Sequence, residues 1–317
     1  MISLPPDPQD FPYKVAIHKD VFKDSKRGNR AVPVKFTYPQ GNASEKYPIV
    51  IWSHGLGGSR DGAGFLARYL ASHGFIVVNV QHPGTDSSLW EGKSGHPWDN
   101  IRASRIPRKA TLQRFQDIPF ILDQLKRWVR QYPQIGKFFD LENIGMSGHS
   151  FGAVTAQIMA GQALGRSMRK YRLHEPRFKA AIAYSPSVTY NHNESPEQIY
   201  GSIAIPLMYM TGTRDSSPVS GKDYRYRLEI FKNAKGPDQY MIVLDDADHM
   251  VFAGSRGKLG ATQNRQTQEN VIKSAALVFW QAYLKQDKQA IAFLKNEEIE
   301  NWIKPFGRFS SRNISQY

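Results

Sequence analysis

Two kinds of hydrophobic pattern alternate along the chain. Short uninterrupted apolar runs fit buried β-strands, whereas apolar residues spaced three or four positions apart fit helices with one apolar face. The runs predict strands at residues 48–53, 75–81, 143–147, 179–185, 206–211 and 239–245, and alternating apolar residues predict an earlier strand at residues 32–38. The wider spacing predicts helices at residues 64–73, 118–132, 151–163 and 271–284, and a further one around residues 289–303. This order predicts βαβ units, and therefore an α/β fold with a mostly parallel central sheet flanked by helices on both faces.

One stretch between a predicted strand and a predicted helix carries neither pattern. Residues 82–106 are rich in Pro, Gly, Ser and Asp. Loops of this length without secondary structure are uncommon in compact domains and tend to be functional or disordered. Trp90 and Trp98 are large apolar residues in this polar loop. They are expected either to wall a substrate-binding pocket or to anchor the loop to the core, and the sequence leaves both alternatives open.

The domain organisation follows from length and composition. The 317 residues contain no internal repeat and no low-complexity linker, and 40% of them are hydrophobic, enough for a sizeable core. One domain is predicted over residues 1–317, with its core at about residues 32–284 and the excursion of residues 82–106 over the active site. No apolar run reaches the ~18 residues that a membrane span requires. Residues 1–6 lack signal-peptide features, so a cytoplasmic location is expected, with the periplasm or secretion as the alternative if a signal peptide is missing from this sequence.

The charge balance is strongly basic. The chain has 42 Lys and Arg residues against 28 Asp and Glu residues, a net charge of +14, which favours anionic partners. No nucleic-acid-binding motif accompanies this charge, so no specific nucleic-acid partner is expected. Basic residues cluster within residues 102–114 and 166–172, where solvated faces are predicted, with peripheral contact with an anionic membrane as the alternative.

A candidate nucleophile stands in Gly148-His149-Ser150-Phe151-Gly152, which follows the predicted strand at residues 143–147 and opens a predicted helix. This is the G-x-S-x-G pattern in a strand–turn–helix context. A serine nucleophile must stand on a sharp, crowded turn with its Oγ exposed, so the flanking positions require small residues. Because glycines fill both positions, we expect Ser150 to be the nucleophile. The alternative interpretation is an ordinary tight turn.

A serine hydroxyl needs a base to remove its proton and an acid to orient that base. With this motif the partners follow the serine in the order Asp or Glu, then His. His249 lies just past the last predicted strand, where a loop can lean over the sheet, and is the candidate base. His174 and His192 also follow the serine, but neither comes directly after a strong strand. The alternative for His249 is a surface loop histidine.

The candidate acid is Asp215, which follows the predicted strand at residues 206–211. Its alternative role is to cap a turn or a helix. Asp245, Asp246 and Asp248 are rivals by residue type, but they crowd the loop of the candidate histidine itself.

The oxyanion of a tetrahedral intermediate requires N–H donors. One is expected to be the backbone N–H of Phe151, the residue after the nucleophile. The other is expected in Ser53-His54-Gly55-Leu56-Gly57-Gly58, whose glycines let the chain turn its amides inward after a predicted strand. By position we favour the N–H of Leu56, and we expect His54 to be a structural residue of this loop.

Together these segments resemble an α/β-hydrolase. The resemblance rests on residues 53–58 and 148–152, on Gly212-Thr213-Arg214-Asp215 and on Ala247-Asp248-His249. It is strongest to the platelet-activating-factor acetylhydrolase-like and dienelactone-hydrolase-like branch, to which residues 71–75 and 80–84 are also similar. It extends over about residues 32–284 and implies an esterase with the nucleophile, acid, base and oxyanion donors named above. True dienelactone hydrolases use a cysteine, and this chain has none.

The predicted function is hydrolysis of a carboxylic ester, a small molecule or a lipid, through an acyl-enzyme on Ser150. The enzymatic alternative is a phospholipase A2-type acyl hydrolase of short-chain or oxidised phospholipids. The non-enzymatic alternative is a catalytically silent binding protein on the same fold, which the intact Ser, Asp and His disfavour. Such a mechanism requires no cofactor, and no His, Asp and Glu cluster has metal-ligand spacing, so neither a cofactor nor a metal is expected.

Overall fold

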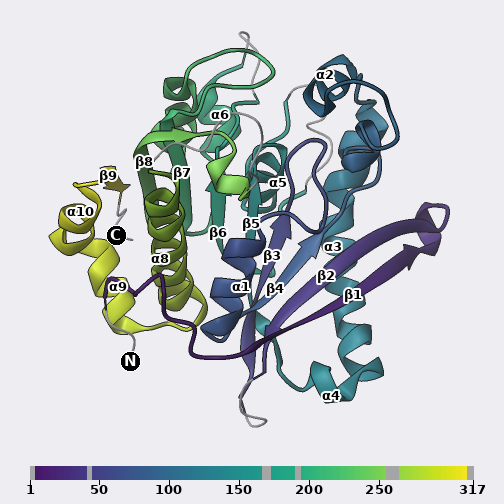
Figure 1. Cartoon of the computed structure of the whole chain (residues 1–317), viewed down its shortest axis with the longest axis horizontal. Helices are drawn as coiled ribbons and strands as arrows, with labels where there is room; N and C mark the ends of the chain where they lie inside the picture. The colour runs from purple at the N-terminus through teal and green to yellow at the C-terminus, as the bar shows by residue number, and fades with distance from the viewer. Residues whose placement is uncertain (1–3, 41–44, 166–172, 190–193, 255–263, 313–317) are drawn as a thin grey trace.

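The computed structural model describes residues 4–40, 45–165, 173–189, 194–254 and 264–312. Within these residues, nine strands form one sheet in the order β1-β2-β4-β3-β5-β6-β7-β8-β9 (Figure 1). The strands are β1 (Val15–Asp24), β2 (Arg30–Pro39), β3 (Tyr47–Ser53), β4 (Ile76–Val80), β5 (Phe139–His149), β6 (Phe178–Tyr184), β7 (Leu207–Arg214), β8 (Gln239–Asp248) and β9 (Gly307–Arg312). The α-helices of the same part of the chain are α1 (Gly64–Ser72), α2 (Pro97–Ala103), α3 (Arg108–Gln131), α4 (Pro133–Gly136), α5 (Phe151–Met159), α6 (Pro196–Tyr200), α7 (Leu228–Asn233), α8 (Arg265–Leu284), α9 (Lys288–Lys295) and α10 (Glu297–Ile303).

The sheet is parallel in its middle and antiparallel at both ends. In the part of the sheet order from β4 to β8, each strand is parallel to the next. β2 and β1 at one end, and β9 at the other, are antiparallel. The predicted mostly parallel sheet is confirmed. Because parallel strands end at one edge, the loops after β3, β5, β7 and β8 gather at that edge, where open α/β folds bind ligands.

Helices cover both faces of the sheet (Figure 1). α1 and α8 pack on one face, and α3 and α5 pack on the other. Successive residues of a strand point to opposite faces. Ile49 and Ile51 of β3 accordingly join the core on the α3 side, whereas Val50 and Trp52 join the core on the α8 side. A strand buried on both faces has no polar side, which is why β3 is an uninterrupted apolar run in the sequence.

Two strands are absent from the pattern-based prediction, and both lie outside residues 32–284. β1 and β9 are the edge strands of the sheet. In β1, Ile17 and Val21 are 54% and 42% exposed, so its apolar residues do not form a buried run. In β9, Phe309 is the one apolar side chain among six residues. Edge strands of this kind lack the signal that a two-sided core imposes on central strands.

The helix boundaries also differ from the prediction. α3 begins at Arg108 rather than near residue 118, because its first turns are polar in sequence. α5 ends at Met159 rather than at residue 163, and Gly161 follows with a φ of 117°. Residues 82–106 are not without secondary structure, because they contain α2 and a 3₁₀ helix at Ser87–Leu89.

Candidate active site

Ser150 occupies the turn between β5 and α5. Its φ of 56° and ψ of −113° are a strained combination for a residue with a Cβ atom. The flanking glycines explain how the turn is closed. A Cβ atom on Gly148 would collide with the backbone of Gly152, and one on Gly152 would collide with the carbonyl of Ser53. The expected strand–turn–helix context of the motif is therefore present, with the serine at its tip.

Asp215 and His249 meet at the same edge of the sheet. Asp215 directly follows β7 and His249 directly follows β8, and these strands are parallel neighbours. Asp215 Oδ1 lies 2.7 Å from His249 Nδ1. The carboxyl group is fully buried, and the imidazole is buried with 8% of its side chain exposed. The pair expected from the sequence is thus formed by residues 34 positions apart.

The surroundings of Asp215 favour its charged form. Burial alone would raise the pKa of this carboxyl group, but His249 and Arg227 outweigh burial, and the net pKa is lowered. Arg227 Nη2 lies 2.9 Å from Asp215 Oδ1, and Thr211 donates its hydroxyl to Oδ2 at 2.8 Å. An ionised carboxylate accepts the Nδ1–H of His249, and this arrangement assigns the histidine tautomer with Nε2 free to accept a proton.

Arg227 is a residue of this site that sequence reasoning missed. Its side chain is fully buried, and it also donates to the backbone carbonyls of Asp215, Ser185 and Pro186. It therefore ties the loop after β6 to the loop after β7. No local pattern marks it, because residues 224–227 read as a charged surface turn.

The rival acids and bases are placed elsewhere. Asp245 and Asp246 are exposed, and Asp248 accepts the backbone N–H groups of the two residues that follow His249. His174 is exposed. His192 and the basic residues at 166–172 lie outside the described residues. Of the candidates that the structure describes, Asp215 is the carboxylate that contacts His249.

His149, inside the serine motif, also supports the candidate base. Its Nε2 lies 2.8 Å from the backbone carbonyl of His249, and the two rings are 4.5 Å apart. Burial and the neighbouring His249 lower the pKa of His149 to about 3, so the ring is neutral. The position of His149 directly before Ser150 in the sequence is the signal from which a role near the site could have been predicted.

Ser150 and His249 both line a cavity of about 380 Å³. Residues 54–58 form one wall, and Trp90, Trp98 and Ile101 from residues 82–106 form another. Trp90 also donates its indole N–H to the carbonyl of Gly57 at 2.7 Å, so it lines the cavity and fastens the two walls together. Trp98 lies on α2, with the guanidinium of Arg102 5.9 Å from its ring.

The two candidate oxyanion donors lie on segments that flank the cavity. Leu56 lines it, and Phe151 is the first residue of α5, where N–H groups have no acceptor within the helix. The ring of Phe151 packs against Phe115 and Arg114, so any contact of Phe151 with a ligand would come from its backbone. His54 is buried, and burial lowers its pKa well below the usual value, as suits a structural residue.

Two features were searched for in the described residues, a metal site and a membrane-spanning helix. Among them, no group of three or more His, Asp or Glu side chains is arranged to hold a metal ion. No described helix is long and apolar enough to cross a membrane.

Comparison with known proteins adds independent information. The family described as platelet-activating factor acetylhydrolase, isoform II, matches residues 13–91, a range that includes the loop of residues 53–58. The platelet-activating factor acetylhydrolase of Canis lupus familiaris is 24% identical over 265 residues, which cover 71% of this chain and 52% of that protein. The same enzyme of Cavia porcellus is 24% identical over 314 residues, which cover 88% of this chain and 67% of that protein.

The chain has an α/β fold with a mostly parallel sheet, and it is similar to platelet-activating factor acetylhydrolases. The resemblance drawn from the sequence motifs is confirmed by these matches. The alignments span about half to two thirds of the length of these two relatives. The family match ends before Ser150, Asp215 and His249, so the arrangement of those three residues rests on the geometry above.

Proposed function

We propose that this protein is a serine esterase that hydrolyses carboxylic esters. The observation that supports this most directly is the position of Ser150 on a strained turn in the same cavity as the buried Asp215–His249 pair. Nucleophile, base and orienting acid come from the ends of three parallel strands, which hold them in fixed relation.

In the proposed reaction His249 removes the proton of the Ser150 hydroxyl as the oxygen attacks the ester carbonyl carbon. Asp215 keeps the Nδ1–H of His249 in place and stabilises the imidazolium that forms. The amides of Leu56 and Phe151 bind the oxyanion. The imidazolium then protonates the leaving alcohol, and a water molecule cleaves the acyl-enzyme by the same route. This chemistry uses no metal and no cofactor.

A phospholipid ester is the second candidate substrate. It is favoured by the relatives, whose name describes removal of an acetyl group from platelet-activating factor. The cavity of about 380 Å³ is at the small end of ligand pockets, which favours a short acyl chain. The net charge of +14 would favour peripheral contact with an anionic membrane.

The test is an acyl-length series of nitrophenyl esters together with a short-chain phospholipid, measured on the wild-type protein and on Ser150→Ala. We expect turnover that falls to background in Ser150→Ala, and labelling of Ser150 alone by an organophosphonate. Labelling of another serine would contradict the assignment of the nucleophile. Absence of turnover and of labelling in the wild-type protein would favour the silent binding protein.

A further inference from the structure

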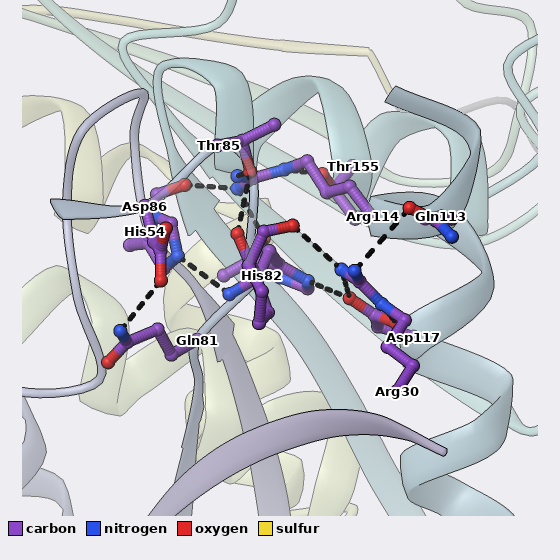
Figure 2. Close-up of polar contacts among 12 residues, drawn as sticks. Arg30, His54, Gln81, His82, Thr85, Asp86, Gln113, Arg114, Asp117 and Thr155 are labelled. Atoms are coloured by element: carbon purple, nitrogen blue, oxygen red, sulfur yellow. Dashed lines mark hydrogen bonds and ion pairs between the residues drawn. The ribbon is translucent and has the colours of Figure 1, made fainter. Parts of the chain in front are cut away.

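A buried polar cluster that the proposed chemistry does not use lies beside the loop of residues 53–58 (Figure 2). Its centre is Arg114 of α3, whose side chain is fully buried. The prediction that the basic residues within 102–114 form a solvated face is therefore wrong for Arg114. A buried guanidinium is costly unless its N–H groups are satisfied. The other buried members of the cluster are Ser53, His54, His82, Thr85, Asp117 and Thr155.

On one side, Arg114 holds the loop that carries the Leu56 amide. Its Nη2 donates to the Ser53 hydroxyl at 2.8 Å and to the backbone carbonyl of His54. Its Nη1 donates to the hydroxyl of Thr85 at 3.0 Å. The backbone carbonyl of Thr85 in turn accepts the N–H of the loop glycine at position 57, at 2.9 Å. The contacts of Arg114 thus reach the loop both before and after the candidate donor.

On the other side, Arg114 holds the start of α5. Its Nε donates to the hydroxyl of Thr155 at 3.0 Å, and this hydroxyl donates to the carbonyl of Phe151 at 3.1 Å. The guanidinium also lies 4.5 Å from the centre of the Phe151 ring. One side chain therefore contacts both segments that carry the candidate oxyanion donors.

A second layer of the cluster supports Ser53. His82 donates from Nδ1 to Asp117 at 3.0 Å (Figure 2). Its Nε2 lies 3.0 Å from the Ser53 hydroxyl. Asp117 also accepts two hydrogen bonds from Arg30, each of 2.8 Å. Burial and the neighbouring Arg114 lower the pKa of His82 to about 4, so the ring is neutral and Nε2 accepts the Ser53 proton.

The Ser53–His82–Asp117 chain repeats the residue types of a serine triad, but it does not act on a substrate. All three side chains are 0% exposed, so no ligand reaches them. Instead, these hydrogen bonds orient the Ser53 hydroxyl so that a lone pair of its oxygen faces Arg114.

We propose that Arg114 is a positioning residue of the oxyanion hole, a role that rests on the proposed esterase function. Donors stabilise a developing oxyanion only when they are already in place, and a displacement of about 1 Å is enough to cost on the order of 100-fold in rate. Leu56 and Phe151 lie on separate segments of the chain. Arg114 couples these segments by direct contacts with both.

The experiment compares Arg114→Lys with wild type on an oxo ester and on the matching thiono ester. Lysine keeps the positive charge, but its single ammonium group cannot replace the planar set of N–H donors with which arginine binds several acceptors at once. Because a thiono sulfur is a poor hydrogen-bond acceptor, the oxo-to-thiono ratio of kcat/KM reports oxyanion binding. We expect kcat on the oxo ester to fall about 10- to 100-fold, with KM nearly unchanged and the ratio reduced.

Two further variants make the test specific. Thr155→Val keeps the volume of the side chain but removes the link to the Phe151 carbonyl, and should lower the ratio in the same direction to a smaller extent. Arg177→Lys is the matched control, because Arg177 binds Glu175 and the Asp123 side chain of α3, away from the cluster. It should leave the ratio unchanged. Melting temperatures are measured for every variant.

The outcomes separate this inference from the proposed function. Loss of melting temperature in Arg114→Lys with an unchanged ratio would show a purely structural role and overturn the proposal. If Arg114→Lys does not fold, an unchanged ratio in Thr155→Val overturns it. A wild-type protein that turns over no ester in a Ser150-dependent manner overturns the proposed function, and this inference with it.

Discussion

His149 donates a hydrogen bond from its ring to the backbone carbonyl of His249, across 2.8 Å. The first residue precedes the candidate nucleophile, and the second is the candidate base. The contact ties the serine turn to the loop after β8, so the distance between Ser150 and His249 does not depend on loop conformation alone. Because burial and His249 lower the pKa of His149 to about 3, this donor stays neutral across the physiological range.

We therefore expect His149→Ala to reduce kcat by about 10-fold while Ser150 remains reactive, because a less well positioned base still removes the proton. The measurements are kcat, KM and the rate of organophosphonate labelling. His174→Ala, an exposed histidine, is the matched control. Wild-type kcat in His149→Ala would show that the contact has no influence on the base.

Asp215→Asn should lower kcat by about 10⁴-fold, as in the serine-protease triad, because an amide stabilises the wrong tautomer of His249. The readout is ester turnover at constant pH, with the melting temperature measured alongside. Asp245→Asn, at an exposed carboxylate near the same loop, should have little effect. If Asp245→Asn were the crippling change, the acid would be assigned to the wrong strand.

Replacing Trp90 or Trp98 should change the ester preference in both cases, but the melting temperature should fall only for Trp90. Both line the cavity, so replacing either with alanine should shift discrimination between long and short esters by about 1–3 kcal/mol. Trp90→Ala should also lower the melting temperature, because it removes the hydrogen bond to Gly57. The measurement is kcat/KM across an ester series for both variants. Unchanged preferences with lower melting temperatures in both would assign these residues to anchoring alone.

Acid should destabilise the fold through its buried histidines. Burial lowers the pKa of His82 to about 4 and that of His149 to about 3, whereas an unfolded histidine titrates near 6.5. The unfolded chain therefore binds more protons, and stability falls as the pH decreases from about 6.5 to about 4. Each unit of lowered pKa is worth about 1.4 kcal/mol when protonation is complete.

The check is the free energy of unfolding as a function of pH, for wild type and His82→Gln. The variant should have a shallower decline between pH 6.5 and 4, because one of the titrating groups is gone. The exposed His174→Gln should follow the wild-type curve. A wild-type stability that does not change over this range would contradict the burial of neutral histidines.

Features that depend on neighbours in sequence could be predicted without the structure. The central strands have a core on both faces, so their apolar runs identified them, whereas β1 and β9 at the edges lack that signature. Ser150 could be predicted as the candidate nucleophile because the turn that presents it needs glycines at fixed positions beside it. The order of acid and base along the chain pointed to Asp215 and His249, whose contact the sheet then provides.

The two buried arginines near the candidate site could be recognised only from the tertiary structure. Arg114 and Arg227 stand among other basic residues, and nothing in their neighbourhood distinguishes a solvated arginine from a buried one. Their partners are carbonyls, hydroxyls and a carboxylate brought in from distant strands and loops. Whether a guanidinium is buried depends on whether such acceptors surround it, and that is settled only when those segments pack together.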